Sequence, residues 1–252
     1  MKFIKYLFFG CILSIYGICN ADLLEDRSNV LRVGTTGDYA PISFFDEQGK
    51  LQGFAIDMAK ALGKHLNKDI KFVRTSWPTL SQDLKANKFD IAMGGITYTP
   101  ARAKDFLLTS KVIDNGKVAL VRCEYVENYL SEESINQASV RVVVNPGGTN
   151  EKFVKSRLLQ SQVITASDNY VPFSMLLSNK ADVMVTDLIE ARYQSRLHMG
   201  KLCVANSTPF AGTSSYKVYM TPKTNHNLLN NVNEWLNETD IESIAKKWKI
   251  DP

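Results

Sequence analysis

Apolar positions early in the chain form first a short run and then a helical spacing. Residues 30–33 are apolar except for Arg32, and they lead into the glycine-containing segment 34–38. Further on, apolar side chains recur every three or four positions, which places them on one face of a helix: Ala55, Met58, Ala59, Leu62 and Leu66. This pattern predicts a strand, a loop and a helix in that order.

The second half of the chain repeats the pattern. Residues 140–144 form another apolar run, a loop with two glycines follows, and helical spacing resumes at Phe153, Val154 and Leu158. A second pair of segments, 84–93 and 176–185, reads in each case as the end of a helix and the start of a strand. Polar loops and short helices then follow at 94–102 and 186–190. The chain therefore contains two similar βαβ-type units.

Strands that alternate with helices predict an α/β fold with parallel sheets. In such folds ligands bind beyond the carboxyl ends of the strands, so the four polar loops should meet at one crevice between two lobes. We expect strand 117–121 to leave lobe 1 and strand 202–205 to lead back from lobe 2. Lobe 1 is then residues 29–120 and 210–252, and lobe 2 is residues 121–209.

The N-terminus has the pattern of a cleaved secretory signal peptide over residues 1–21. Lys2 and Lys5 precede the apolar run 6–18, which is short for a bilayer span, and small residues follow at 19–21. Two alternatives are an uncleaved anchor and lipid attachment at Cys19. No other apolar run approaches membrane length, so we expect no membrane contact after cleavage.

Charge and cysteine content narrow the functional classes. Lys and Arg number 30 and Asp and Glu number 26, and the signal peptide holds two lysines, so the net charge falls from +4 to 28 − 26 = +2. This near balance, with the basic residues dispersed, gives no argument for a nucleic-acid partner. Cleavage leaves Cys123 and Cys203, an even pair that predicts one disulfide in an exported protein, two free thiols being the alternative. The three histidines are scattered, and no metal site is expected.

Several segments resemble known families. Segments 54–62 and 96–102 resemble the helix and ligand loop of amino-acid-type periplasmic solute-binding proteins, which have a two-lobed type II fold. More specific matches resemble the cyclohexadienyl dehydratases, exported enzymes built on that fold: segments 34–41, 93–97, 114–117, 122–124, 144–151 and 181–187. The resemblance covers about residues 30–210 and is weaker after Phe210. It implies a periplasmic protein whose substrate is prephenate, arogenate or both, with no cofactor because aromatisation drives the reaction.

The resemblance implies a site for a substrate with two carboxylates. Arg102 is the expected carboxylate clamp, because Thr99 and Pro100 can start a helix that carries it at the cleft. Gly95 and Thr97 would add hydrogen-bond donors, and Lys117 would supply a second cation. The alternatives are a solvated surface arginine and a lysine at a strand edge.

Three further groups are candidate substrate ligands. Thr149 and Asn150 open a helix after two glycines, where free backbone N–H groups can bind an anion, although an ordinary helix cap has the same sequence. Asp38 follows the first glycine loop. Trp77 could pack against the substrate ring or equally within the core or hinge.

Glu190 decides between binding and catalysis. The dehydratase pattern implies that Glu190 is a general acid, which burial in a closed cleft would keep protonated. The alternative is that it caps its own helix in a capping box with Asp187. Asp187 fits either function, because an aspartate at this place pairs with the ligand ammonium in transport proteins and arogenate also has an amine.

Three hypotheses follow from the sequence. The leading one is an exported lyase that converts prephenate to phenylpyruvate, or arogenate to phenylalanine, with loss of water and carbon dioxide. The second is a non-catalytic periplasmic binding protein that delivers an amino acid to an ABC importer. The third is a sensor or wall-processing module with this fold, which the lack of an added catalytic or membrane domain disfavours.

Overall fold

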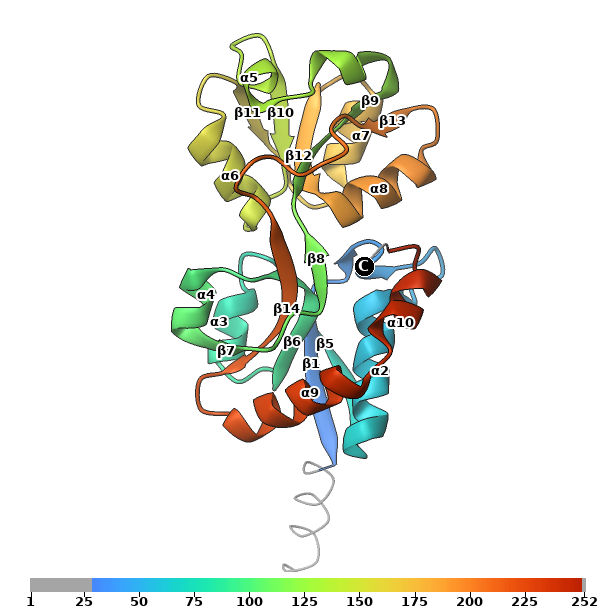
Figure 1. The fold of residues 1–252 in the computed structure, drawn as a ribbon, viewed down its shortest axis with the longest axis vertical. Coiled ribbons are helices and arrows are strands. Elements are labelled where there is room, and N and C mark those ends of the chain that lie inside the picture. The colour runs from blue at the N-terminus through green and yellow to red at the C-terminus, as the bar shows by residue number, and fades with distance from the viewer. Residues whose placement is uncertain (1–28, 251–252) are drawn as a thin grey trace, which may run out of the picture.

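The structure is a computed structural model and describes residues 29–250. It has two lobes, each built on one sheet with helices on its faces, and two chain segments connect them (Figure 1). The predicted signal peptide lies outside the described residues. Among residues 29–250, no helix is long and apolar enough to cross a bilayer.

The sheet of lobe 1 has the order β5-β1-β6-β14-β7, with β8 also paired to β14. Strands β1, β5 and β6 are parallel, as predicted, and β14 runs antiparallel to β6. A small antiparallel sheet of β2, β3 and β4 adjoins it. The strands are β1 Val30–Thr35, β2 Asp38–Tyr39, β3 Ser43–Phe45, β4 Leu51–Gln52, β5 Asp69–Arg74, β6 Ile91–Thr97, β7 Phe106–Leu108, β8 Ile113–Asn115 and β14 Ser215–Pro222.

The sheet of lobe 2 has the order β11-β10-β12-β9-β13 and follows the same plan. Strands β10, β11 and β12 are parallel, and β9 is antiparallel to both β12 and β13. Each lobe therefore receives an antiparallel strand from the chain that has just left the other lobe. The strands are β9 Lys117–Arg122, β10 Arg141–Val144, β11 Gln162–Thr165, β12 Val183–Asp187 and β13 Leu202–Val204.

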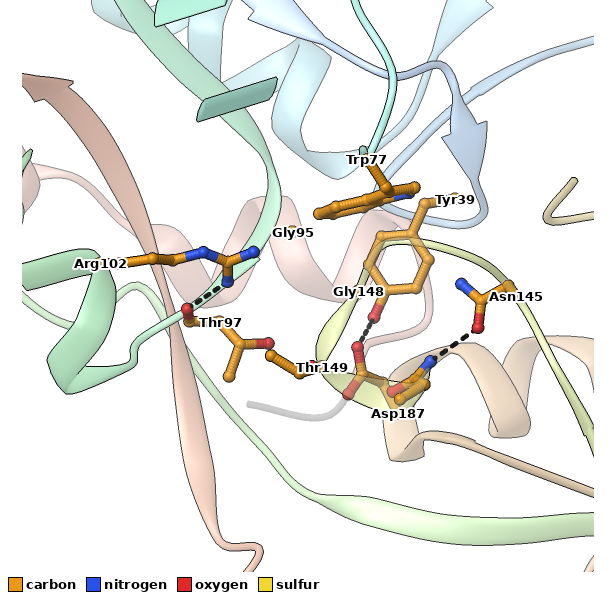
Figure 2. A pocket seen from close by; sticks show the side chains of 10 residues that line it. Tyr39, Trp77, Gly95, Thr97, Arg102, Asn145, Gly148, Thr149 and Asp187 are labelled. Atoms are coloured by element: carbon orange, nitrogen blue, oxygen red, sulfur yellow. Dashed lines mark hydrogen bonds between the residues drawn. The ribbon is translucent and has the colours of Figure 1, made fainter. Parts of the chain in front are cut away.

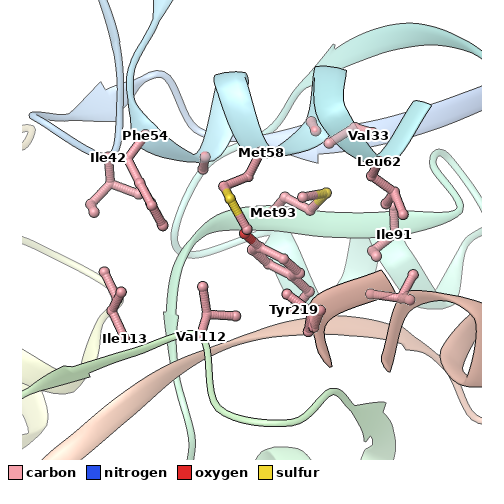
Figure 3. Close-up of a cluster of buried hydrophobic side chains, with 14 of the residues drawn as sticks. Val33, Ile42, Phe54, Met58, Leu62, Ile91, Met93, Val112, Ile113 and Tyr219 are labelled. Atoms are coloured by element: carbon pink, nitrogen blue, oxygen red, sulfur yellow. The ribbon is translucent and has the colours of Figure 1, made fainter. Parts of the chain in front are cut away.

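The helices cover the sheets as the apolar spacing predicts. In α2, the predicted face packs on lobe 1: Ala55, Met58, Ala59 and Leu62 are buried, and Met58 and Leu62 contact the core around Val33 and Tyr219 (Figure 3). The helices of lobe 1 are α2 Phe54–Leu66, α3 Leu80–Lys85, α4 Pro100–Asp105, α9 His226–Glu238 and α10 Ile241–Lys247. Those of lobe 2 are η1 Cys123–Asn128, α5 Glu132–Ile135, α6 Thr149–Arg157, α7 Val171–Leu177 and α8 Leu188–Leu197.

Equivalent polar contacts support the internal repeat. In lobe 1, Arg32 Nη2 donates to Asp90 Oδ1 at 2.6 Å and to Asn87 Oδ1 at 3.0 Å. In lobe 2, Arg141 Nη2 donates to Asp182 Oδ1 at 2.6 Å and to Asn179 Oδ1 at 2.9 Å. Asn87 and Asn179 both have φ of 56°. The two units thus share side-chain chemistry as well as strand order.

The first crossing between lobes differs from the prediction. Strand β9 lies wholly in the sheet of lobe 2, so the crossing falls before Lys117 rather than at 120/121. The reason is that the apolar run 118–121 is a central strand, hydrogen-bonded on both sides, and is fully buried. The return to lobe 1 lies between Val204 and Ser215.

The predicted disulfide joins Cys123 to Cys203, with an S–S distance of 2.08 Å. Because Cys123 and Cys203 stand next to the two expected crossing segments in the sequence, a bond on the hinge side of lobe 2 was predicted, and this prediction is wrong. Cys123 follows the end of β9 that is remote from Lys117, and Cys203 pairs with Val121 near that same end. The length of β9 puts the bond about 20 Å from the interlobe site, so it ties together the outer part of lobe 2.

Candidate functional site

A narrow cavity lies between the two lobes, where loops after β6, β10 and β12 meet (Figure 2). This is the convergence of strand ends that the sequence predicts. The free volume is about 20 Å³, room for about one water molecule, so the lobes are closed and must part to admit a ring-sized ligand. The lining residues are Tyr39, Trp77, Gly95, Thr97, Arg102, Asn145, Gly148, Thr149, Asn150 and Asp187.

Asp187 is the centre of a buried ionic cluster that joins the lobes. Its Oδ1 accepts from Lys117 Nζ at 2.6 Å and from Asn115 Nδ2 at 2.7 Å. Its Oδ2 accepts from Lys217 Nζ at 2.7 Å and from Tyr39 OH at 2.6 Å. Lys217 and Tyr39 belong to lobe 1, and Asp187 ends β12 in lobe 2, so these contacts hold the cavity closed.

The ionic cluster keeps its charges despite burial. Burial by itself would raise the pKa of Asp187, but the charges of Lys117 and Lys217 outweigh it and hold that pKa far below its ordinary range. Burial lowers the pKa of Lys217 to about 8, against the attraction of Asp187. Burial and the negative charge of Asp187 raise the pKa of Tyr39 well above its ordinary value. Asp187 is therefore ionised, and Tyr39 is a neutral donor.

Lys117 connects Asp187 to the start of α6. Its Nζ donates to Thr149 Oγ1 at 2.8 Å and to Asn150 Oδ1, so with Asp187 all three ammonium protons have acceptors. Helix α6 begins at Thr149 after the two glycines, as predicted. Asn150 Nδ2 in turn donates to Thr186 Oγ1 at 3.1 Å, which continues the network toward Glu190.

Glu190 lies in the first turn of α8 and is 2% exposed. Thr186 Oγ1 donates to its Oε2 at 2.5 Å. Burial raises the pKa of Glu190 to about 8, and the Thr186 hydrogen bond opposes the shift. Asp187, the N-cap residue of α8, makes no side-chain capping bond, because its carboxylate binds the lysines instead. Glu190 is thus a buried carboxylic acid that is mostly protonated at neutral pH.

Arg102 and Lys217 are brought together by Thr97. Helix α4 starts as predicted, with Thr99 Oγ1 accepting from the Arg102 backbone N–H at 3.2 Å and Pro100 in the first turn. Arg102 Nη1 donates to Thr97 O at 2.6 Å, and Lys217 Nζ donates to Thr97 Oγ1 at 2.9 Å. Burial lowers the pKa of Arg102, and the Asp187 charge opposes this effect. Two cations therefore bind one residue of the cavity wall.

The structure places three other predicted site residues differently relative to the cavity: Gly95, Trp77 and Asp38. Gly95 has φ of +84°, and a Cβ there would lie 2.3 Å from the Tyr39 ring, so glycine is needed for Tyr39 to reach Asp187. Trp77 lines the cavity with its ring nearly perpendicular to that of Tyr39 and also packs against the lobe 1 core, whereas its packing against a substrate ring stays a prediction. Asp38 does not line the cavity in this closed form. Within residues 29–250, Trp77 Nε1 and Asp38 Oδ1 are buried without a hydrogen-bond partner.

Five residues that line the cavity or bind Asp187 are absent from the sequence-based set: Tyr39, Asn115, Asn145, Gly148 and Lys217. The first four lie in segments that carry the family resemblance, so proximity to those motifs was an available signal. Lys217 lies in the C-terminal segment where the resemblance weakens. Its signal is a lysine directly before the apolar residues 218–220 of strand β14, where it is 3% exposed.

The donors that gather here suit an anionic ligand. Arg102, Lys117 and Lys217 are cations, and the surrounding amides and hydroxyls can orient carboxylate oxygens. In the part of the chain that the structure describes, no group of three or more His, Cys, Asp or Glu residues is placed to hold a metal ion.

A two-lobed α/β fold with a closed polar cavity between the lobes defines a solute-binding protein fold of type II. The chain belongs to the bacterial extracellular solute-binding proteins, family 3, which it matches over residues 31–250. It is 39% identical over 221 residues to a cyclohexadienyl dehydratase of Pseudomonas aeruginosa, covering 88% of this chain and 81% of that one. The resemblance inferred from the motifs is thereby confirmed.

Solved structures agree with this fold. A crystal structure of an ancestral amino acid-binding protein, a precursor of cyclohexadienyl dehydratase, is 34% identical and superposes with a TM-score of 0.82, covering 91% of this chain and 99% of that one. An ancestral arginine-binding protein bound to arginine is 28% identical with a TM-score of 0.80, covering 88% and 98%. The chain is thus similar both to an enzyme and to binding proteins.

Proposed function

We propose that this protein is a cyclohexadienyl dehydratase that converts prephenate to phenylpyruvate, with Glu190 as its general acid. The observation that carries the proposal is a buried carboxylic acid, protonated at neutral pH, next to the buried cluster of Asp187 with Lys117 and Lys217. The 39% identity to a cyclohexadienyl dehydratase supports the same activity. A binding protein has no need of a proton donor, whereas a dehydratase must protonate a leaving hydroxyl.

The proposed reaction needs no cofactor. Arg102 and the lysines hold the two carboxylates, and Glu190 gives its proton to the ring hydroxyl as the C–O bond breaks. The C–C bond to the ring carboxylate breaks in the same process, carbon dioxide leaves, and its bonding electrons complete the aromatic ring. The Glu190 carboxylate then regains a proton from water. Arogenate would react in the same way to give phenylalanine.

Two features of the site support the role of Glu190. Glu190 follows Asp187 by three residues at the start of α8 but does not line the closed cavity, so the proposal requires that parting of the lobes gives substrate access to its carboxyl group. Burial keeps the proton on at neutral pH, and a pKa near the working pH makes a carboxyl group an effective acid catalyst. We place the mature protein in the periplasm, on the basis of the sequence pattern at residues 1–21 and the extracellular family.

The second candidate is an amino-acid-binding protein that serves an ABC importer. The similarity to an ancestral amino acid-binding protein favours it. Purified mature protein is mixed with prephenate, and phenylpyruvate is followed by its absorbance, while calorimetry measures binding of the common amino acids. Turnover that depends on Glu190 supports the dehydratase. Absence of turnover together with micromolar binding of an amino acid selects the importer function.

A further inference from the structure

We infer that Lys217 makes the site select anions that lack an α-ammonium group, so that it prefers prephenate over arogenate and 2-oxo acids over amino acids. The inference deepens the proposed function and rests on it only for the identity of the substrate. It is carried by the hydrogen bonds of Asp187 and by the placement of Arg102 and Lys217 on Thr97.

Asp187 is the carboxylate of the cavity wall to which a ligand ammonium could bind. A carboxylate accepts about four hydrogen bonds. Each Asp187 oxygen already accepts two, from Lys117 and Asn115 on one side and from Lys217 and Tyr39 on the other. An ammonium group would therefore have to displace one of these four donors, and it would meet the two lysine charges that already flank the carboxylate.

The net charge of the site also favours ligands without an ammonium group. Arg102, Lys117 and Lys217 carry three positive charges against one negative charge on Asp187. Asp38 acts electrostatically on the nearby Glu190, and the positive excess persists when it is counted. A dianion such as prephenate complements this excess better than arogenate, whose ammonium adds a positive charge in a poorly hydrated space.

Thr97 shows where an anion would lie. Its carbonyl accepts from Arg102 and its hydroxyl accepts from Lys217, which holds two like charges on one residue. Burial is the main cause that lowers the pKa of Lys217, and the positive charge of Arg102 adds to it, an effect that an anion between the two cations would offset. Lys217 itself does not line the closed cavity, so it acts on the ligand through Asp187 and Thr97 as a specificity-determining residue.

The test compares two ligands of nearly the same shape. Phenylpyruvate and phenylalanine differ at the α-carbon in a keto or an ammonium group, and their dissociation constants are measured by calorimetry at pH 7 for wild type, Lys217→Met, Lys217→Gln and Lys217→Arg. Wild type should bind phenylpyruvate more tightly. The neutral variants should shift the ratio of the two dissociation constants at least about tenfold in favour of phenylalanine. Lys217→Arg keeps the positive charge and should keep the wild-type ratio. Thermal melts identify which neutral variant is folded.

Two outcomes would overturn the inference. One is a wild type that binds phenylalanine as tightly as phenylpyruvate, and the other is an unchanged ratio in a folded neutral variant. Turnover of prephenate and arogenate is assayed on the same proteins, with the ratio of kcat/KM expected to move in the same direction. A shift in the binding ratio without any turnover supports the role of Lys217 and counts against the dehydratase alone. Turnover with an unmoved ratio does the reverse.

Discussion

The proposed general acid can be tested by replacing Glu190 with glutamine, which keeps the size and polarity of the side chain but cannot donate an acidic proton. The pKa of Glu190 is raised from 4.5 to about 8. At pH 7 roughly nine tenths of the wild-type molecules then carry the proton, and ionising the group in its site costs about 5 kcal/mol more than in water. General acid catalysis by one group contributes about 10²- to 10⁴-fold, so Glu190→Gln should lower kcat by that factor.

The pH dependence of wild-type activity tests whether Glu190 acts in its protonated form. Glu190 donates a proton, so activity should be level below its pKa and fall as the pH rises through about 8. Lys217 also has a pKa of about 8 and could produce the same fall. Thr186→Val separates the two groups, because the Thr186 hydrogen bond lowers the pKa of Glu190 and its loss should move the alkaline limb upward by about one pH unit. An unmoved limb in this variant would assign the titration to another group.

Stability provides a readout that does not depend on turnover. The folded-state pKa of Glu190 is raised, so the unfolded chain ionises first, and the stabilisation present below about pH 4.5 is lost progressively up to about pH 8. Glu190→Gln does not titrate. The free energy of unfolding of wild type relative to this variant should therefore fall by about 3.5 kcal/mol between pH 5 and pH 8, measured by urea titration at both pH values. A constant difference, together with a Glu190→Gln enzyme within fivefold of wild-type kcat, would refute the reasoning.

Three further changes test other parts of the molecule. Arg102→Gln should weaken phenylpyruvate binding about 10- to 100-fold in calorimetry, because one charge-assisted hydrogen-bonded pair is lost. An unchanged affinity would show that Arg102 does not bind the carboxylate. Gly95→Ala should weaken phenylpyruvate binding at least about tenfold, because the added Cβ would clash with the Tyr39 ring. An unaltered dissociation constant would show that the Tyr39 ring can move aside without cost to binding. The double change of Cys123 and Cys203 to serine removes a link across 80 residues and should lower the free energy of unfolding in urea by up to ~4 kcal/mol. Because the bond is remote from the site, kcat should stay within about twofold of the wild-type value. Loss of activity in a folded variant would contradict that remote position.

Most of the fold could be predicted because it depends on local patterns. The helix face of α2 and the strands β1 and β10 follow directly from the apolar spacing, and the repeat of strand, loop and helix predicted two lobes with a shared cleft. The helix starts at Pro100 and Thr149 were also readable, because capping residues and glycines determine them locally.

What the sequence did not predict depends on contacts between distant segments. The run 118–121 looks the same whether it leaves lobe 1 or lies at the centre of lobe 2, and only its pairing with β12 and β13 decides. The place of the disulfide depends on the same pairing. Lys217 was missed for a related reason: it is 30 residues from Asp187 and 120 from Thr97, and its contact with Asp187 forms only when the two lobes meet. Capping by Asp187 failed as a local rule because two lysines from outside its helix compete for the carboxylate.

The ionic cluster holds the lobes together as well as setting the proposed ligand preference, and this determines how Lys217 variants must be interpreted. The bonds of Asp187 to Lys217 and Tyr39 cross between the lobes, so a ligand that parts them exposes three groups that are buried and paired when the lobes are closed. Removing Lys217 weakens closure for every ligand and leaves Asp187 less compensated, so absolute affinities will change for reasons unrelated to selectivity. Closure acts equally on phenylpyruvate and phenylalanine, whereas the charge beside Asp187 acts on only one α-substituent. The ratio of the two affinities therefore isolates the charge of Lys217 from its part in holding the lobes together.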